Sequence, residues 1–354
     1  MAYTNIDDPS AQFQIATYTG NGTDNTAITY DGNSDMQPDF LWFKLRSTTG
    51  NHVLFDSNRG VTKYLRSNTT AAETTNSTLL KSFNTDGFTV GTAANTNYNT
   101  YTLVSWGFKA NGGTTSSNTD GSITSTVQAN TTAGFSIVTF DSASSGNFSV
   151  GHGLGVQPAM IITKNREGTG QWYCWHKSLT GGDSNSTYLI SLNRTDEEAS
   201  YANAWGAGVT SSVFGMQSGN TATASNDYVA YCFAEKQGYS KFGKYVGNGG
   251  TSSTGNAFVY TGFKPAWVMI KLSSSSGGYW AIHDDKRNGY NDGNQRLWAD
   301  RTNTESGAAL DFLSNGFRIT STAGGYGASG STYIYMAFAE NPFTTSTGVP
   351  ATAR

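Results

Sequence analysis

Charged residues are scarce in this chain of 354 residues, and that scarcity argues against several classes of partner. They make up 13% of the chain, about half the share usual in soluble globular proteins. Lys and Arg number 22 and Asp and Glu number 25, which leaves a formal net charge of −3. So small a charge provides no basic surface for nucleic acid and no basic segment for a membrane surface. We therefore expect no nucleic acid partner and no membrane insertion.

Cysteine and long apolar segments are also scarce. The two cysteines, Cys174 and Cys232, lie in apolar runs and lack the spacing of metal ligands, so we expect buried, reduced thiols. No run of about 18 apolar residues occurs, and the first residues, "MAYTNIDDPS", lack the basic and apolar regions of a signal peptide. We therefore expect neither a membrane span nor Sec export.

Glycine, aromatic residues and β-branched residues are plentiful. The chain holds 42 Gly, and aromatic residues make up 13% of it. Short apolar runs alternate with Gly, Asn, Asp and Ser, which is typical of strands joined by turns. The composition therefore predicts an all-β protein.

One sequence plan recurs along the chain. "YTGNG" at Tyr18 returns as "YVGNG" at Tyr245, and a proline follows each tyrosine after twenty residues. A third version lies between them, with Phe140 in the tyrosine position. A lysine follows each proline by six residues, and each copy closes on a strand with a phenylalanine in one register. The recurring positions are Tyr18 and Tyr245; Pro38, Pro158 and Pro265; Lys44, Lys164 and Lys271; and Phe108, Phe233 and Phe338.

This recurrence predicts three tandem β-sandwich repeats, jelly-roll or lectin-like, of about 100 residues each. Each proline suits the first residue of a central strand, where no ladder donor is lost. The Gly-, Ser-, Thr- and Asn-rich stretch after the first repeat reads as a flexible linker, and we expect repeats two and three to pack rigidly together. The expected parts are an N-terminal segment 1–12, repeat one 13–110, linker 111–134, repeat two 135–237, repeat three 238–342 and a C-terminal tail 343–354.

The glycines of "YTGNG" allow two interpretations. In a phosphate-binding loop they would lie between a strand and the N-terminus of a helix. Here "FQIATY" precedes them and another strand pattern follows, with no helical periodicity. The pattern therefore favours a turn between strands, in which glycine supplies positive φ angles.

The candidate chemical groups do not assemble into a known site. His176 and His283 each lie twelve residues after the recurring lysine, where the first copy has Asp56, so the residue type changes between copies. One histidine per copy is too few for a zinc site. The acidic neighbours Asp284–Asp285 and Glu197–Glu198 should point to opposite faces of a strand or lie in loops. We expect no catalytic residues, no metal and no cofactor.

Tryptophan offers the remaining candidate binding residues. Trp42, Trp106 and Trp267 lie in apolar strands and should belong to the core. Trp205 and Trp298 lie in polar surroundings, "NAWGAG" and "QRLWADR". If exposed, they could stack on a sugar or on a neighbouring subunit, so we take them as the candidate ligand-binding residues.

These patterns together resemble a known family. "YTGNG", the strand "P-D/A-x-x-x-x-K", "LFDSNRG", "DGF" and "YVAYCFAEKQGYSKFGKY" resemble a repeated domain of uncharacterised function found in virion-associated proteins of tailed phages, especially phages of marine bacteria. The resemblance covers nearly the whole chain. It implies a non-enzymatic structural protein on the exterior of the virion, assembled in the host cytoplasm, such as a tail fibre, tail-tip adhesin or capsid decoration.

The resemblance also implies partners: other virion proteins and a glycan or protein receptor on the host surface. The alternative is a glycan-degrading depolymerase, which needs two carboxylates roughly 5–10 Å apart across a groove. The symmetry of appendages favours a homo-oligomer, with a trimer first. We expect neighbouring chains to hold the two short terminal segments in place.

Overall fold

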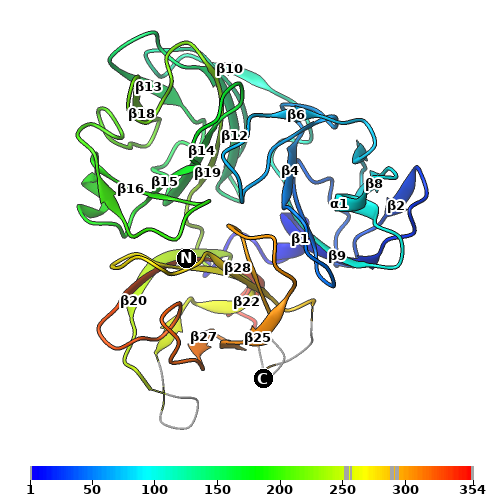
Figure 1. The fold of residues 1–354 in the computed structure, drawn as a ribbon. Coiled ribbons are helices and arrows are strands. Elements are labelled where there is room, and N and C mark those ends of the chain that lie inside the picture. Colours follow the sequence, from blue (N-terminus) through cyan, green and yellow to red (C-terminus); the bar gives the residue numbers. More distant parts are fainter. Residues whose placement is uncertain (1, 251–254, 256, 288–290, 292–294, 352–354) are drawn as a thin grey trace.

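The computed structural model describes residues 2–250, 255, 257–287, 291 and 295–351. The protein is all-β, as predicted. Within the described ranges, helix is confined to the short segments η1 (Pro9–Ala11), α1 (Ala94–Asn97) and η2 (Gly182–Ser184). Three groups of antiparallel sheets surround a common centre (Figure 1), and we call them units 1, 2 and 3 in chain order.

Unit 1 consists of a main sheet, a smaller sheet and a short ribbon. The main sheet has the order β1-β9-β3-β4, the smaller one β2-β8-β7, and the ribbon pairs β5 with β6. Their bounds are β1 (Phe13–Thr19), β2 (Thr26–Ile28), β3 (Phe40–Leu45), β4 (Val53–Asp56), β5 (Lys63–Tyr64), β6 (Thr74–Thr75), β7 (Leu80–Phe83), β8 (Phe88–Val90) and β9 (Thr102–Phe108).

Unit 2 has a longer main sheet, β10-β11-β12-β19-β14-β15-β16-β17, and a smaller sheet, β13-β18. Their bounds are β10 (Ser116–Asn118), β11 (Ser125–Asn130), β12 (Phe135–Asp141), β13 (Asn147–Gly151), β14 (Met160–Asn165), β15 (Tyr173–His176), β16 (Tyr188–Ser191), β17 (Ala199–Ser200), β18 (Val213–Gln217) and β19 (Asp227–Phe233).

Unit 3 has the main sheet β20-β28-β22-β23-β24-β25 and the smaller sheet β21-β27-β26. Their bounds are β20 (Ser240–Val246), β21 (Phe258–Tyr260), β22 (Phe263–Leu272), β23 (Ala281–Asp284), β24 (Gln295–Trp298), β25 (Ser306–Ala308), β26 (Leu310–Leu313), β27 (Gly316–Ile319) and β28 (Thr332–Pro342).

The same pairing order occurs in all three main sheets. A seven-residue strand, β1, β12 or β20, pairs with the unit's last strand, and the last strand pairs with the strand that carries the recurring lysine. The strand register places Phe108 opposite Phe40, Phe233 opposite Met160, and Phe338 opposite Trp267. These pairings define equivalent positions in the three units. The boundaries that the sequence suggests for separate domains stay a prediction.

The central strands of each main sheet are buried on both faces, which explains their continuous apolar sequences. In β3, Leu41 and Phe43 pack in the core that unit 1 forms with its own smaller sheet. Phe40 and Trp42 point the opposite way, into a core that all three units share. The alternation follows from the two-residue period of a strand. The prediction that three tryptophans belong to the core is confirmed, because Trp42, Trp106 and Trp267 are each at most 4% exposed.

Three phenylalanines meet in the shared core, one from the last main-sheet strand of each unit. The ring centroids of Phe108 and Phe233 are 5.7 Å apart, those of Phe108 and Phe338 5.0 Å, and those of Phe233 and Phe338 6.0 Å. These separations lie in the favourable range for aromatic pairs. The recurring phenylalanine of the sequence is therefore the central contact between the units.

The segment 111–134, expected to be a flexible linker, contains two strands of the main sheet of unit 2. Strands β10 and β11 lie within it, and β11 pairs with β12 along its whole length. Asp39 further fixes its start by accepting hydrogen bonds from the backbone of Ala110, Gly112 and Gly113. The expectation of a flexible linker is wrong for these two strands, because polar Ser and Thr residues tolerate an outer strand whose faces are partly solvated.

The terminal segments make contacts within the chain, and the expectation that neighbouring chains also hold them stays a prediction. Ile6 is buried in the shared core, and the hydroxyl of Tyr3 donates to the carbonyl of Gly262. The backbone N–H of Ser346 donates to Asp7 at 2.6 Å, so the two segments also bind each other. Residues 352–354 of the predicted tail lie outside the described residues.

The glycines of the two "Y-x-G-N-G" motifs lie in turns between strands, as predicted. Gly22 follows β1 and Gly249 follows β20, with φ of +68° and +73°. A strand of the smaller sheet, β2 or β21, is the next element among the described residues in each case. The motif is therefore a turn that permits left-handed backbone, and it precedes no helix N-terminus. Among the described residues, no helix has the length and apolar character needed to cross a membrane.

Candidate functional site

The structure overturns Trp205 as an exposed ligand-binding residue. Its side chain is 0% exposed and packs in the core of unit 2, and its Nε1–H donates to the carbonyl of Tyr188 at 2.9 Å. The polar residues around it in sequence belong to loops that fold over the ring. Local sequence polarity therefore misled the prediction, because burial of a tryptophan depends on what packs over it from elsewhere in the chain.

Trp298 is half-buried and lies in unit 3, so the two tryptophans do not form one site. The guanidinium of Arg296 lies 5.0 Å from the centre of its ring, and its carbonyl is 2.8 Å from Nε2 of His52 in unit 1. The ring of Tyr279 packs edge-on against it, with centroids 6.3 Å apart. These contacts give Trp298 a structural role between two units.

The recurring lysines join the units. Each is fully buried and donates hydrogen bonds to backbone carbonyls of another unit. Lys44 reaches Thr302 of unit 3, Lys164 reaches Thr70 of unit 1, and Lys271 reaches Thr195 and Asp196 of unit 2, with N–O distances of 2.8–3.3 Å. The three contacts run from unit 1 to 3, from 2 to 1 and from 3 to 2, so they close a ring.

Burial lowers the pKa of these ammonium groups. The pKa of Lys44 falls to about 7, and those of Lys164 and Lys271 fall to about 8. Desolvation is the largest cause in each case, because an ammonium loses its hydration inside the protein. Their amines carry the contacts between units and are not open to a substrate.

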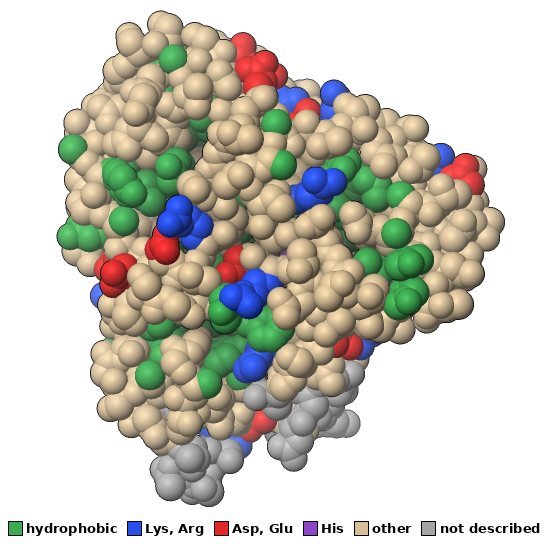
Figure 2. Space-filling model, viewed as in Figure 1, with side chains coloured by type: hydrophobic (Ala, Val, Ile, Leu, Met, Phe, Trp, Pro, Cys, Tyr) green, Lys and Arg blue, Asp and Glu red, His purple; other side chains and the backbone are tan. Residues whose placement is uncertain are grey.

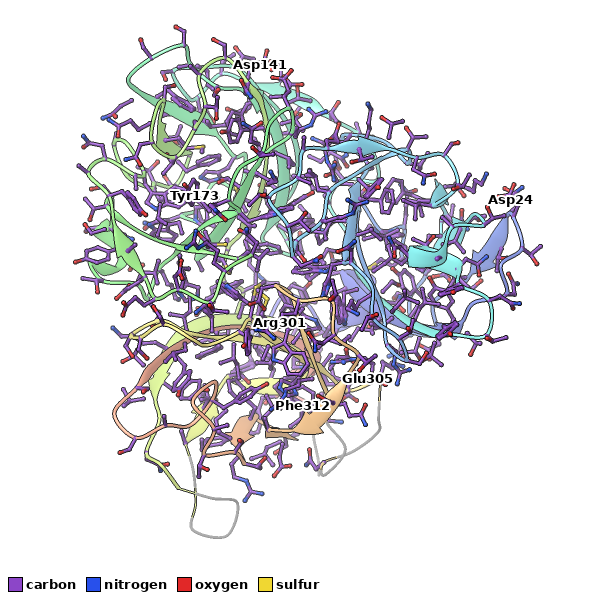
Figure 3. All side chains as sticks on the ribbon, in the orientation of Figure 1. Asp24, Asp141, Tyr173, Arg301, Glu305 and Phe312 are labelled. Atoms are coloured by element: carbon purple, nitrogen blue, oxygen red, sulfur yellow. The ribbon has the colours of Figure 1, made fainter. Side chains whose placement is uncertain are left out.

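Arginine side chains reinforce two of the three junctions. Arg46 forms a bidentate pair with Glu305 of unit 3 at 2.9 and 3.0 Å, and Arg166 forms one with Glu73 of unit 1 at 2.9 and 3.1 Å. Figure 3 shows Glu305 near the junction of units 1 and 3. Paired N–H donors on a carboxylate fix orientation as well as distance.

Two buried Asp–Arg pairs also face a neighbouring unit. Asp56 and Arg59 of unit 1 are 2.6 Å apart, and both bind the hydroxyl of Tyr231 in unit 2. Asp284 and Arg287 of unit 3 are likewise 2.6 Å apart, and Asp284 accepts from Nε1 of Trp106 in unit 1. Sequence reasoning missed these pairs, although the spacing D-x-x-R occurs in both "LFDSNRG" and "HDDKRNG".

The histidines are interior residues. The strand register makes Asp284, and not His283, the equivalent of Asp56 and His176, so the sequence alignment of His283 was one residue out. His176 lies within 3.1 Å of the carbonyl of Tyr335, and burial lowers the pKa of His176 to about 4. No group of three or more His, Cys, Asp or Glu side chains in the described ranges could hold a metal. The cysteines are free and buried, as predicted.

The other recurring positions are structural as well. Pro38, Pro158 and Pro265 are buried. The hydroxyl of Tyr18 donates to Thr96 at 2.6 Å and that of Tyr245 donates to Tyr326 at 2.8 Å, so each tyrosine ties the motif turn to a later loop of its unit.

An acidic pocket lies between units 1 and 3, with a volume of about 230 Å³. Asp285 and Glu340 of unit 3 line it, together with Asp8 and Asp31 of unit 1 and one cationic side chain, Lys286. Burial raises the pKa of Asp285 to about 8, and the charges of Glu340 and Asp284 contribute. Asp285 is therefore largely protonated at neutral pH, beside a second carboxyl group.

An aromatic patch on the surface of unit 3 provides the exposed rings that we expected from Trp205 and Trp298. Phe258, Tyr260 and Phe343 are 49%, 56% and 39% exposed. Tyr3 packs edge-on against Phe343, with ring centroids 6.4 Å apart. Phe258 and Tyr260 both point outward from β21 because they are two residues apart on an edge strand. The alternation "FVY" was the only signal in the sequence.

Comparison with known proteins identifies the family without a function. No curated protein and no solved structure matches the chain. One family model, described as a domain of unknown function (DUF7483), matches residues 8–342. That range begins beside η1 and ends with β28, so it includes all three units, the acidic pocket and most of the aromatic patch. The chain belongs to the DUF7483 family.

Proposed function

We propose that this chain is a non-enzymatic structural protein on the exterior of a tailed-phage particle, as a tail fibre, tail-tip adhesin or capsid decoration. The resemblance drawn from the sequence motifs suggests the particle. The observation that carries the non-enzymatic part is the use of the recurring residues. All of them are buried except Tyr18, which is half-buried.

Groups that could perform chemistry are used to join the units. The lysine amines donate to carbonyls, and the Asp–Arg pairs bind a tyrosine or a tryptophan of the next unit. Buried ion pairs contribute little net stability, but removal of one partner is costly. Such residues suit a rigid body that withstands exposure outside the cell without disulfides.

The aromatic patch is the surface we propose for attachment to the host. Exposed Phe and Tyr side chains can stack on the apolar face of a sugar ring or pack against a receptor protein. On the face in Figure 2, Lys, Arg, Asp and Glu side chains lie scattered among mostly uncharged atoms.

The test begins with purified particles of a phage whose genome encodes this chain. Immunogold labelling with an antibody against the recombinant protein, followed by cryo-electron microscopy, should place it at the tail tip or over the capsid. Particles that lack the chain by mass spectrometry, while the lysate contains it, would contradict the proposal.

A second measurement tests the patch. Tyr260→Ala and Phe258→Ala should reduce adsorption of particles to host cells, whereas Tyr98→Ala, which alters a tyrosine of unit 1 that is 43% exposed, should not. Equal adsorption by all three variants would remove the patch from the attachment model.

The alternative, a glycan-degrading depolymerase, rests on the acidic pocket. A protonated Asp285 beside Glu340 has the two carboxyl states that glycoside hydrolysis requires. Release of reducing ends from host surface polysaccharide, abolished by Asp285→Asn, would favour this activity over a purely structural role.

A further inference from the structure

The acidic pocket occupies a position that has an equivalent in unit 2. The backbone N–H of Asp285 donates to Ala266 at 2.9 Å, and that of Lys177 donates to Ala159 at 2.9 Å, one position beyond the paired ends of β23 and β15. Asp285 and Lys177 are therefore equivalent.

Their carboxylate neighbours are equivalent too. Glu340 follows Phe338 by two residues, and Glu235 follows Phe233 by two residues, where each phenylalanine occupies the same register position. Glu340 thus lies beside Asp285 at the place in the sheet where Glu235 lies beside Lys177, although aspartate and lysine carry opposite charges.

In unit 2 the glutamate has cationic partners. Glu235 forms ion pairs with Lys177 and with Lys241 of unit 3, the latter at 2.6 Å. These two ammonium groups, together with burial as the opposing effect, leave the pKa of Glu235 lowered. The protein itself therefore supplies the ammonium group that this position accommodates.

In unit 3 the corresponding ammonium is absent. Glu340 pairs with Lys264, but the place of Lys177 is taken by a second carboxyl, that of Asp285. Oδ1 of Asp285 is buried and accepts no hydrogen bond from any described residue. A buried oxygen of this kind is costly unless a donor reaches it.

The other charged groups around the pocket do not supply that donor. Lys286 pairs with Asp31 at 3.0 Å. Arg287 is bound to Asp284. Asp8 accepts hydrogen bonds from Ser10 and Ser34. The charges facing the space are therefore predominantly negative, on unit 1 as well as on unit 3.

We propose that the acidic pocket binds a primary ammonium group, which occupies the place that Lys177 fills in unit 2 and donates to Asp285 and Glu340. The volume of about 230 Å³ admits the group with a short alkyl chain. Phe13, Ile15 and Ala266 supply apolar walls for that chain. The ammonium can belong to a small amine or to a lysine side chain of another protein.

The carboxyl oxygens of the pocket favour an ammonium over a divalent metal ion. Calcium takes six to eight oxygen ligands, commonly from several carboxylates and carbonyls. No cluster of three or more potential metal-binding side chains is found in the part of the chain that the structure describes. An ammonium needs about three acceptors, and two carboxyl groups can provide them.

The test is a titration of the full chain, followed by NMR, with n-butylamine against n-butanol at pH 8.5. n-Butylamine should shift the resonances of Ala266 and Glu340 saturably, and n-butanol should not. Below pH 8, affinity for n-butylamine should increase about tenfold for each unit by which the pH rises. Asp285 must lose its proton to bind the ammonium, while the amine keeps its own. A lysine-containing tripeptide and its norleucine counterpart then distinguish a side chain from a free amine.

Two variants make the result decisive. Asp285→Asn should weaken binding at least tenfold, because a hydrogen bond to a charged group is lost. Asp285→Lys reproduces the arrangement of unit 2 and should abolish binding while raising the melting temperature. Asp183→Asn, at an exposed carboxylate of unit 2, is the matched control and should bind as the parent does.

Three outcomes would overturn the proposal. These are equal binding of amine and alcohol, undiminished binding by Asp285→Lys, and calcium binding that excludes the amine. If Asp285→Asn fails to fold, Asp285→Lys still tests the site, since its side chain has a partner in Glu340. The result is independent of whether the chain occurs on phage particles.

Discussion

Replacement of Phe338 by alanine should destabilise the whole molecule and not unit 3 alone. Phe338 is 2% exposed and packs on Phe108 of unit 1 and Phe233 of unit 2, at ring separations of 5.0 and 6.0 Å. Because its neighbours come from every unit, the cavity left by Phe338→Ala opens in the core that they share.

The expected loss follows from cavity formation. Truncation of a buried phenylalanine costs about 3–5 kcal/mol. The unfolding entropy is about 2.1 cal/mol/K per residue, so over a chain of 354 residues the melting temperature should fall by about 4–7 °C. Phe108→Ala and Phe233→Ala should produce falls of the same size, since the three rings occupy equivalent places.

Differential scanning calorimetry measures both the size and the cooperativity of the change. We expect one transition that moves as a whole in each of the three variants. Phe258→Ala is the control, because the side chain is 49% exposed and its removal should cost less than about 1 kcal/mol. A transition that splits, with part of the heat absorption unmoved in Phe338→Ala, would refute the shared core.

Three further predictions concern the contacts between units. Lys44→Met removes a buried amine whose pKa is about 7 in the folded chain and 10.5 when unfolded. Between these pKa values the unfolded parent binds more protons than the folded parent. As the pH rises from 7.5 to 10, the free energy of unfolding of the parent should therefore increase, relative to that of the variant, by about 1.4 kcal/mol per pH unit. Urea denaturation at a series of pH values measures this difference. Asp56→Ala removes the carboxylate 2.6 Å from buried Arg59, which keeps its ion pair with Glu73, and should cost about 3–5 kcal/mol, whereas Asp183→Ala should be neutral within about 0.5 kcal/mol. Limited digestion with thermolysin, which cleaves at apolar residues such as Ile123 and Val127, should leave residues 116–130 intact because β10 and β11 belong to the main sheet; early cleavage there would restore the linker interpretation.

The elements of the fold were predictable where burial is local. Strand β14 reads "MIITKN" and β22 contains "AWVMIKL", and such runs identify strands buried on both faces. What lies on the second face was not predictable, because residues far apart in sequence supply it. Phe13, Phe135 and Phe338 meet only after the chain has closed on itself.

The candidate site was harder to predict for the same reason. Asp284 and Asp285 were expected to face opposite ways, and they do: one binds Arg287, and the other lines the acidic pocket. Glu340 lies 55 residues further along the chain than Asp285, so no local spacing connects the two. The prediction that Trp205 is exposed was wrong, because the polar residues that flank it in sequence gave no sign of the core that surrounds it.

The ring of lysine contacts has a topological consequence. Every unit donates to one neighbour and receives from the other, so the packing has no first or last member, although the polypeptide has two ends. The segments near those ends bind each other through Ser346 and Asp7. A circular permutant that joins the ends by a short peptide and opens the chain between β19 and β20 would keep every contact between units and only move the cut.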